Sequence, residues 1–400
     1  MCGYLLLAPH TDKIREVKSL HHILGKSYGS SVRVVAGLCS LIGIIYMLGW
    51  EVSIGSETIN SLIATYVTDN PSIARFNSNV ITTAIVLGSI FYTVIGGLRG
   101  NGYADIFLNS IKAISIVVIT VAAIVYFSNS DLNFWKYFFP PLNQMKANLG
   151  WYGLLTHIIF SLSWQFVDNS TWQNIIGGKE EQTGDSKFNV RWSGYLVFIA
   201  PGIIGTVLGV TLNSLQGITP DNILSQVLLF TPDNSLIILL YFLMIIGCIM
   251  SMIDGLFLAS TFALVIDIFS PNTSMAELDR NPEKANRILL LIRITLVLIA
   301  IFAVWGVQAL MQALNLSLFD FVYVVIITQL SLLGPVIFAL FNWRGRYATV
   351  IILTSLIVGF GTVVLGNHIE IKELTDGAGS ITAFTSLFLS FVFLKNKHAV

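Results

Sequence analysis

One apolar run of the chain, from Ser235 to Phe269, is long enough to cross a lipid bilayer as a helix. Polar residues interrupt its middle, where the sequence CIMSMIDG places Ser251 and Asp254 at membrane depth. These two residues are three positions apart and therefore share one face of a helix. An ionisable group in hydrocarbon costs at least ~2.5 kcal/mol, so we expect Asp254 to face a partner, a water-filled cavity or an ion pathway.

The composition supports a membrane protein over the whole chain. Hydrophobic residues make up 54% of the 400 residues and charged residues only 11%, whereas soluble domains carry about 25% charged residues. This excludes a soluble enzyme. The net charge is zero, which argues against a nucleic-acid partner, because nucleic acid requires a basic footprint. The three cysteines and the histidines show no metal-ligand spacing.

Ten segments of about 20 apolar residues predict ten membrane-spanning helices, and hence an all-α polytopic membrane protein. The predicted segments are 34–59, 80–97, 106–127, 154–176, 195–212, 236–268, 288–310, 318–341, 348–365 and 381–394. The connectors contain turn sequences such as Asp69-Asn70-Pro71 and Asn281-Pro282.

Lys and Arg residues in the connectors predict the orientation of the chain. Sixteen of them lie on the side of the N-terminus, and four lie on the other side: Arg75, Lys136, Lys146 and Lys372. Because positive residues collect on the cytoplasmic side, both termini are predicted to be cytoplasmic, in an integral plasma (inner) membrane protein.

Several motifs resemble those of the sodium:solute symporter family. The segment Tyr92–Asp105 is similar to a loop that this family writes as Gly-Gly-Leu, a spacer and Trp-Thr-Asp, and Ser251–Phe269 resembles its sodium-site helix. Trp172–Asn174, followed by a Gly-Gly-Lys ending, and Ser19–Arg33 match two further family segments. The chain departs from the family at Tyr103 and Ala104, which replace Trp and Thr, and at Met252, which replaces a hydroxyl residue.

The resemblance implies a core of two inverted five-helix repeats with ligand sites at the membrane midplane. The first three predicted helices would be the third to fifth of repeat one, the next five would form repeat two, and the last two would be peripheral. This divides the chain into a cytoplasmic N-terminal segment (1–33), a transport core (34–341) and two peripheral helices with a short tail (342–400). The two core helices that open repeat one in the family have no counterpart in this sequence. Either the chain is a fragment, or its start is placed downstream of the native one, or a partner supplies the missing half; we favour a truncated gene product or gene model.

The resemblance assigns an ion pathway to the polar positions of the sodium-site helix and its neighbours. Ser251 matches the first of two sodium-binding hydroxyls, but Met252 offers a soft thioether at the second, so the predicted sodium site is weak. Asp254, Asp105 and Cys248 complete the predicted ion pathway. Ser251 is otherwise a small residue that permits close helix packing, and Asp105 an acid favoured by its helix dipole.

Lys112 is an alternative, purely structural partner for Asp254. It lies within the third predicted span, where a buried ion pair would neutralise both charges. Without such a pair, Asp254 requires water, a cation or a proton.

A polar run, SLSWQFVDNSTW, lies in the middle of the predicted span 154–176 and must line a cavity, because a lipid-facing helix could not hold it. Four of its residues fall on one helical stripe. The predicted substrate pathway consists of Ser161, Trp164, Gln165, Asp168 and, from the eighth span, Gln329. Gln329 precedes Gly334-Pro335, which predicts a kink with freed carbonyl groups.

The expected function is sodium-coupled import of a small organic solute of the amino acid, sugar, urea or carboxylate class. Sodium is the only expected cofactor, and the solute and the lipid bilayer are the expected partners. The alternatives are a proton-coupled carrier of the same fold, in which Asp254 or Asp168 titrates, and a membrane sensor that transports nothing. A membrane enzyme would require a catalytic cluster, and the sequence offers no candidate catalytic residue.

Overall fold

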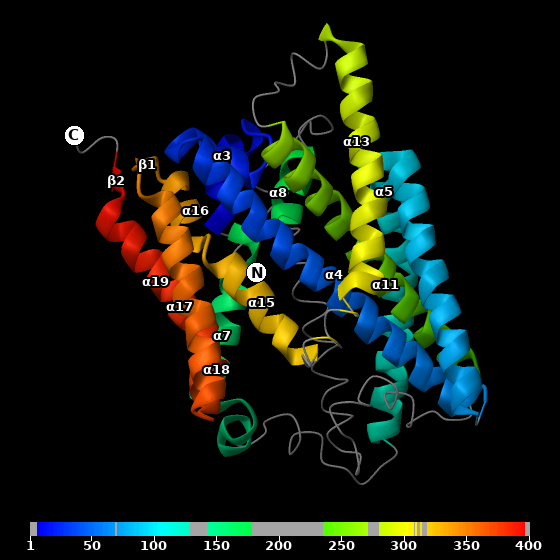
Figure 1. The fold of residues 1–400 in the computed structure, drawn as a ribbon. Helices are drawn as coiled ribbons and strands as arrows, with labels where there is room; N and C mark the ends of the chain where they lie inside the picture. The colour runs from blue at the N-terminus through cyan, green and yellow to red at the C-terminus, as the bar shows by residue number, and fades with distance from the viewer. Residues whose placement is uncertain are drawn as a thin grey trace. The chain divides into compact units, whose positions relative to one another are not determined.

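The structure is a computed structural model that describes residues 6–68, 70–128, 142–177, 235–270, 280–307, 309, 313 and 318–396. These residues are almost entirely helical (Figure 1), apart from one antiparallel pair of two-residue strands, β1 (Trp343–Arg344) and β2 (Lys395–Asn396). Seven of the described helical segments are long and apolar enough to cross a membrane. The prediction of an all-α polytopic membrane protein is confirmed.

Three of the ten predicted spans differ from this set. The segment 195–212 lies outside the described residues. The segment 154–176 is divided between α7 (Leu142–Val167) and α8 (Asn169–Gly177). The last span is α19 (Ala378–Phe393), which is apolar but shorter than the other spans.

The chain forms two compact units. Unit 1 comprises Met1–Met47, Asn143–Leu196 and Leu256–Val400, and unit 2 comprises Leu48–Leu142 and Val197–Gly255. Two long helices, α4 (Ser30–Tyr66) and α11 (Ser235–Phe262), each contribute residues to both units.

Unit 2 is built around α5 (Pro71–Ser128), a helix that bends back into two limbs. Its first turn is capped by Asn70, whose Oδ1 accepts the backbone N–H of Ser72 at 3.0 Å. Gly97 has a φ of 54°, a conformation that favours glycine, and it separates the limbs Pro71–Gly97 and Gly102–Ala122. Both limbs are therefore available to pack against the part of α11 that lies in unit 2.

The N-terminal part of unit 1 is anchored by apolar side chains. Its elements are the 3-10 turn η1 (Ala8–His10), α2 (Thr11–Arg15) and α3 (Leu20–Tyr28). Leu7, Ile14, Leu20 and Leu24 are fully buried in a hydrophobic core of the unit, together with Trp172 of α8. The segment before α4 is thus a packed part of the fold.

The C-terminal part of unit 1 is a bundle in which helices approach closely. Its elements are the π-helical turn η4 (Ala263–Phe269), α13 (Pro282–Ile301), the π-helical turn η5 (Phe302–Gly306), α15 (Leu318–Leu330), α16 (Leu333–Leu340), α17 (Ala348–His368), α18 (Lys372–Asp376) and α19. Helix α19 packs against α15, α16 and α17 (Figure 1). A side chain at Gly334 would collide with the backbone of Ser386, so α16 and α19 touch at backbone distance.

The predicted kink before Pro335 is confirmed as a break between α15 and α16. Proline has no N–H and cannot bond to the carbonyl four residues earlier, which belongs to Ser331. That carbonyl instead accepts the hydroxyl of Ser386 at 2.8 Å, and the same hydroxyl oxygen accepts the backbone N–H of Gly334 at 3.0 Å. One serine of α19 therefore satisfies two backbone groups that the break leaves open.

Candidate ion and solute sites

In unit 2, the polar face of α11 meets both limbs of α5. The Ser251 hydroxyl donates to Oδ1 of Asp105 at 2.6 Å, and the Tyr92 hydroxyl donates to Oδ2 of Asp254 at 2.8 Å. Tyr92 belongs to the first limb and Asp105 to the second. We call these four residues the Asp254 cluster. The structure thus brings together three of the predicted ion-pathway residues and adds Tyr92, which the sequence did not single out.

Asp254 is fully buried. Besides Tyr92, the backbone N–H of Gly255 donates to its Oδ1 at 2.6 Å. Within the described part of the chain, no lysine or arginine forms an ion pair with Asp254. Lys112 instead packs its aliphatic stem against α11, where its Cγ would lie 3.4 Å from a Cβ placed on Gly247. The structure therefore does not supply the Lys112–Asp254 ion pair that would have neutralised this carboxylate.

The cluster offers two carboxylates and two hydroxyls. These are hard oxygen ligands of the kind that a small cation or a proton requires. Met252 and Cys248 both have exposed side chains. The cluster therefore depends on Ser251 and the two acidic residues, while a role for Cys248 stays a prediction.

In unit 1, the predicted polar stripe coincides with the break between α7 and α8. The Asp168 carboxylate accepts the hydroxyl and N–H groups of Ser170 and Thr171, at 2.6 to 3.1 Å. It is thus the N-cap of α8. The Phe166 carbonyl next to the break accepts the indole N–H of Trp172 at 3.0 Å. Both side chains stabilise an interrupted helix, and interrupted helices carry the ligand sites in many transporters.

Two predicted substrate-pathway residues carry buried acceptors beside the two helix breaks. Gln165 lies one turn before the α7–α8 break, and Gln329 is the last residue but one of α15, just before the second break. Both are nearly fully buried. Their Oε1 atoms have no hydrogen-bond partner among the described residues, and the same holds for Oδ1 of Asn169. Because buried polar groups are normally paired, these acceptors are candidates for contact with a polar solute.

The remaining members of the stripe are less enclosed. Ser161 is exposed, and Trp164 is half-buried, with its ring 5.1 Å from that of Phe160. Their place in the substrate pathway stays a prediction, as does that of Asp168.

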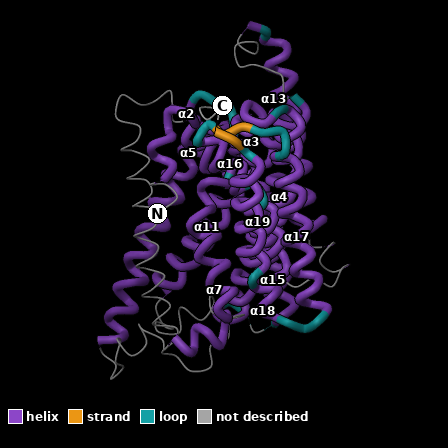
Figure 2. Tube along the Cα trace, turned by 90° about the vertical axis from the view of Figure 1, so that its left-hand side faces the viewer, coloured by secondary structure: helices purple, strands orange, loops and turns teal. Residues whose placement is uncertain are grey.

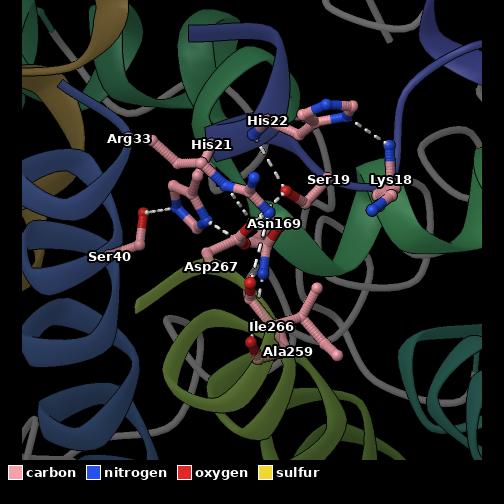
Figure 3. Close-up of polar contacts among 10 residues, drawn as sticks. All are labelled: Lys18, Ser19, His21, His22, Arg33, Ser40, Asn169, Ala259, Ile266 and Asp267. Carbon is pink, nitrogen blue, oxygen red and sulfur yellow. Dashed lines mark hydrogen bonds and ion pairs between the residues drawn. The ribbon is translucent and has the colours of Figure 1, made fainter. Parts of the chain in front are cut away.

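A second buried acid, Asp267, forms an ionic network in unit 1 (Figure 3). Its Oδ1 accepts hydrogen bonds from Nη2 of Arg33 at 2.9 Å and from the Ser19 hydroxyl at 2.7 Å. Its Oδ2 lies 2.7 Å from Nδ1 of His21, whose Nε2 lies 2.9 Å from the Ser40 hydroxyl. All five residues are buried. The network ties the segment before α4 to the π-helical turn η4.

No site predicted from the sequence contains this network. Arg33 was counted as a positive residue outside the spans and as the end of the motif segment Ser19–Arg33, and Asp267 only as one position of the motif Ser251–Phe269. The available signal was that Asp267 is a second acidic residue within the apolar run Ser235–Phe269. Its partners lie more than two hundred positions away, so spacing could not reveal them.

Comparison with known proteins gives a likeness among solved structures. No family model matches the chain, and no curated protein matches it. Among solved structures, a Na⁺-coupled sialic acid symporter in a substrate-bound, outward-open state matches with a TM-score of 0.66 and 15% sequence identity. The match covers 98% of this chain and 83% of the symporter. The chain has the fold of that symporter. Its helix breaks and buried acids therefore lie in the same fold as that of a Na⁺-coupled symporter.

Proposed function

We propose that the chain is a secondary transporter that couples sodium entry to the movement of a small organic solute. The observation that carries the proposal is the Asp254 cluster, in which a buried carboxylate without an ion pair among the described residues lies midway along a membrane-spanning helix. Acidic residues at this depth commonly mark ion pathways. The likeness to a Na⁺-coupled sialic acid symporter supports sodium as the ion.

In this proposal the two units have different tasks. Ser251, Asp105 and Asp254 hold or pass the cation in unit 2, and sodium is its expected identity. Gln165, Gln329 and the α7–α8 break contribute polar contacts to the solute in unit 1. The solute is of the amino acid, sugar, urea or carboxylate class, and sialic acid is the first candidate because the structural neighbour carries it.

We also propose an orientation of the chain in the membrane. We place both termini in the cytoplasm of the cell that holds the protein in its plasma (inner) membrane. Lys372 and Arg346 are both exposed on the protein, so their labelling compares the two sides of the membrane. A membrane-impermeant maleimide should reach a cysteine at Lys372 from outside but not one at Arg346.

Met252 occupies the second hydroxyl position of the predicted sodium site. Met252→Ser should lower the sodium concentration for half-maximal binding, because it adds a hard oxygen next to Ser251.

Proton coupling is the second candidate, and the same carboxylate favours it. A buried Asp254 without a cationic partner among the described residues can bind a proton in place of sodium. The two candidates differ in the gradient that drives transport.

The test is solute uptake by the reconstituted chain under separate gradients. Proteoliposomes would be offered radiolabelled N-acetylneuraminate, L-proline, D-galactose, urea and pantothenate in turn. We expect a sodium gradient to drive accumulation of at least one of them. Accumulation that follows a pH gradient alone would favour proton coupling, and no gradient-dependent accumulation of any of the five would contradict the proposal.

A further inference from the structure

A basic surface surrounds the two-stranded ribbon of unit 1. Its exposed members are Lys26 of α3, Arg344 of β1, Arg346, and Lys395 of β2, and we call it the ribbon surface. In the antiparallel pair, Arg344 lies directly opposite Lys395. Figure 2 shows the two strands beside α3 and α16, and both helices contact this region. Like charges opposite one another destabilise a strand pair, so this arrangement calls for a compensating anion.

The protein does not supply that anion within the described residues. None of the four cations of the ribbon surface has an acidic partner among the residues that the structure describes. Asp267 and Glu57 form their ion pairs elsewhere in the chain, with His21, Arg33 and Arg75.

A fifth cation, Lys13, concentrates positive potential beneath the ribbon. Its ammonium group donates to the carbonyls of Ala339 and Leu340, at 2.7 and 3.0 Å, and to Oδ1 of Asn342 at 2.6 Å. Burial lowers the pKa of Lys13, and the charges of Lys26 and Arg344 lower it further, while the charge of Glu16 acts in the opposite direction. Lys26 and Arg344 are therefore close enough to repel Lys13, which is itself held in place by the end of α16.

Aromatic side chains place this surface at the level of lipid headgroups. The Trp343 ring lies 4.5 Å from that of Phe338 and 6.0 Å from that of Phe391, and the Tyr347 ring lies 5.8 Å from that of Phe393. Tyr347, Phe391 and Phe393 are all exposed. Tryptophan and tyrosine collect where hydrocarbon meets water, and the ribbon connects directly to α17, a membrane-spanning helix.

We propose that the ribbon surface binds the headgroup phosphate of an anionic phospholipid, with Arg344 and Lys395 as its principal ligands and the exposed aromatic rings against the acyl chains. An anionic lipid supplies the negative charge that the strand pair lacks. Its acyl chains would also contact the exposed rings of Tyr347, Phe391 and Phe393, which a free phosphate ion would not contact. Each basic residue at a membrane surface contributes about 1 kcal/mol to the attraction of anionic lipids, so several basic residues together bind them more tightly.

The test is lipid retention by the intact chain. The protein would be reconstituted in nanodiscs of equal parts phosphatidylglycerol and phosphatidylcholine and then extracted from them. The lipid that remains bound to the protein would be measured by native mass spectrometry. We expect selective retention of phosphatidylglycerol by the wild type. The double variant Arg344→Gln/Lys395→Gln should weaken it by roughly fivefold for each removed charge. Lys372→Gln is the matched control, since Lys372 is an exposed cation of the same unit that begins α18, beyond the far end of α17.

A second measurement separates loss of binding from loss of folding. In detergent without anionic lipid, the double variant should melt at the wild-type temperature or above it, because the change removes repulsion across the strand pair. Adding phosphatidylglycerol should raise the melting temperature of the wild type and the Lys372 variant only. Equal retention of phosphatidylglycerol by all three proteins would overturn the proposal, and so would full displacement of the lipid by millimolar inorganic phosphate.

Discussion

The phenolic hydroxyl of Tyr92 donates a hydrogen bond to the carboxylate of Asp254 across 2.8 Å, and so links the first limb of α5 to the middle of α11. The bond fixes the position of a buried acid but does not neutralise its charge. Asp254 therefore remains able to attract a cation.

This geometry predicts different effects for two variants of nearly unchanged size. Asp254→Asn removes the charge and should weaken ²²Na⁺ binding to the purified protein at least about tenfold, which corresponds to ~1.4 kcal/mol. Tyr92→Phe keeps the charge and should leave the affinity within about threefold of wild type, a difference of ~0.7 kcal/mol. If both variants bound sodium as the wild type does, Asp254 would not be a ligand.

Removing the carboxylate of Asp267 should destabilise the protein strongly. Asp267→Asn removes the negative charge that faces the buried Arg33 guanidinium at 2.9 Å, and breaking a buried pair in this way costs about 3–5 kcal/mol. Glu57→Gln is the matched control, because it breaks the ion pair with Arg75 in which both side chains are 57% exposed. Such exposed pairs contribute about 0–1 kcal/mol. Thermal unfolding in detergent should show a much larger decrease for Asp267→Asn, and equal decreases would contradict this account of the network.

The Ser386 hydroxyl should stabilise the break between α15 and α16. In Ser386→Ala, the Ser331 carbonyl and the Gly334 N–H both lose their partner in a buried position, which should cost about 1–3 kcal/mol. Ser355→Ala serves for comparison, since that buried hydroxyl bonds only to Ile351 within its own helix. A melting temperature for Ser386→Ala that matched the Ser355→Ala value would show that the break is held by other contacts.

Stability should fall at acidic pH because of His22. Burial lowers its pKa below 6.5, with further lowering by the charges of Arg33 and Lys18. Its Nδ1 also accepts the backbone N–H of Lys18 at 3.1 Å, which requires an unprotonated nitrogen. The unfolded chain then binds more protons than the folded one, so the stabilisation is complete above pH 6.5 and is lost as the pH falls through the lower, folded pKa.

The measurement is the melting temperature between pH 5 and pH 7.5. It should rise with pH in the wild type and rise less in His22→Asn, whose amide oxygen can still accept the Lys18 N–H. Some slope should remain, because burial and Lys13 also lower the pKa of His10. An unchanged slope in the variant would remove His22 from this explanation.

The helices of this protein follow from local sequence features. Apolar runs of sufficient length set most of the spans, and Asn70 and Asn281 cap helices where turn residues were expected. Pro335 predicted a break because its missing N–H acts on its own helix. These features depend on neighbours in the sequence and can be recognised without tertiary structure.

The pairings between helices could not be recognised in this way. Asp254 was predicted to face a partner, but nothing in the sequence distinguishes Tyr92 from Lys112 as that partner. Asp168 is an acidic residue within a predicted span, which is typical of a pathway residue. Only the structure reveals that its carboxylate oxygens also cap α8. The partner of a buried polar group is set by how helices pack, and packing depends on contacts distributed over the whole fold.

The most direct test of the central claim is whether solute and sodium enter together. Proteoliposomes of the wild type and of Asp254→Asn would be given ²²Na⁺ outside, with and without each solute of the uptake panel. We predict that at least one solute stimulates ²²Na⁺ entry in the wild type severalfold and has no such effect in Asp254→Asn. Equal ²²Na⁺ entry with and without every solute, in both proteins, would contradict sodium-coupled transport by this chain.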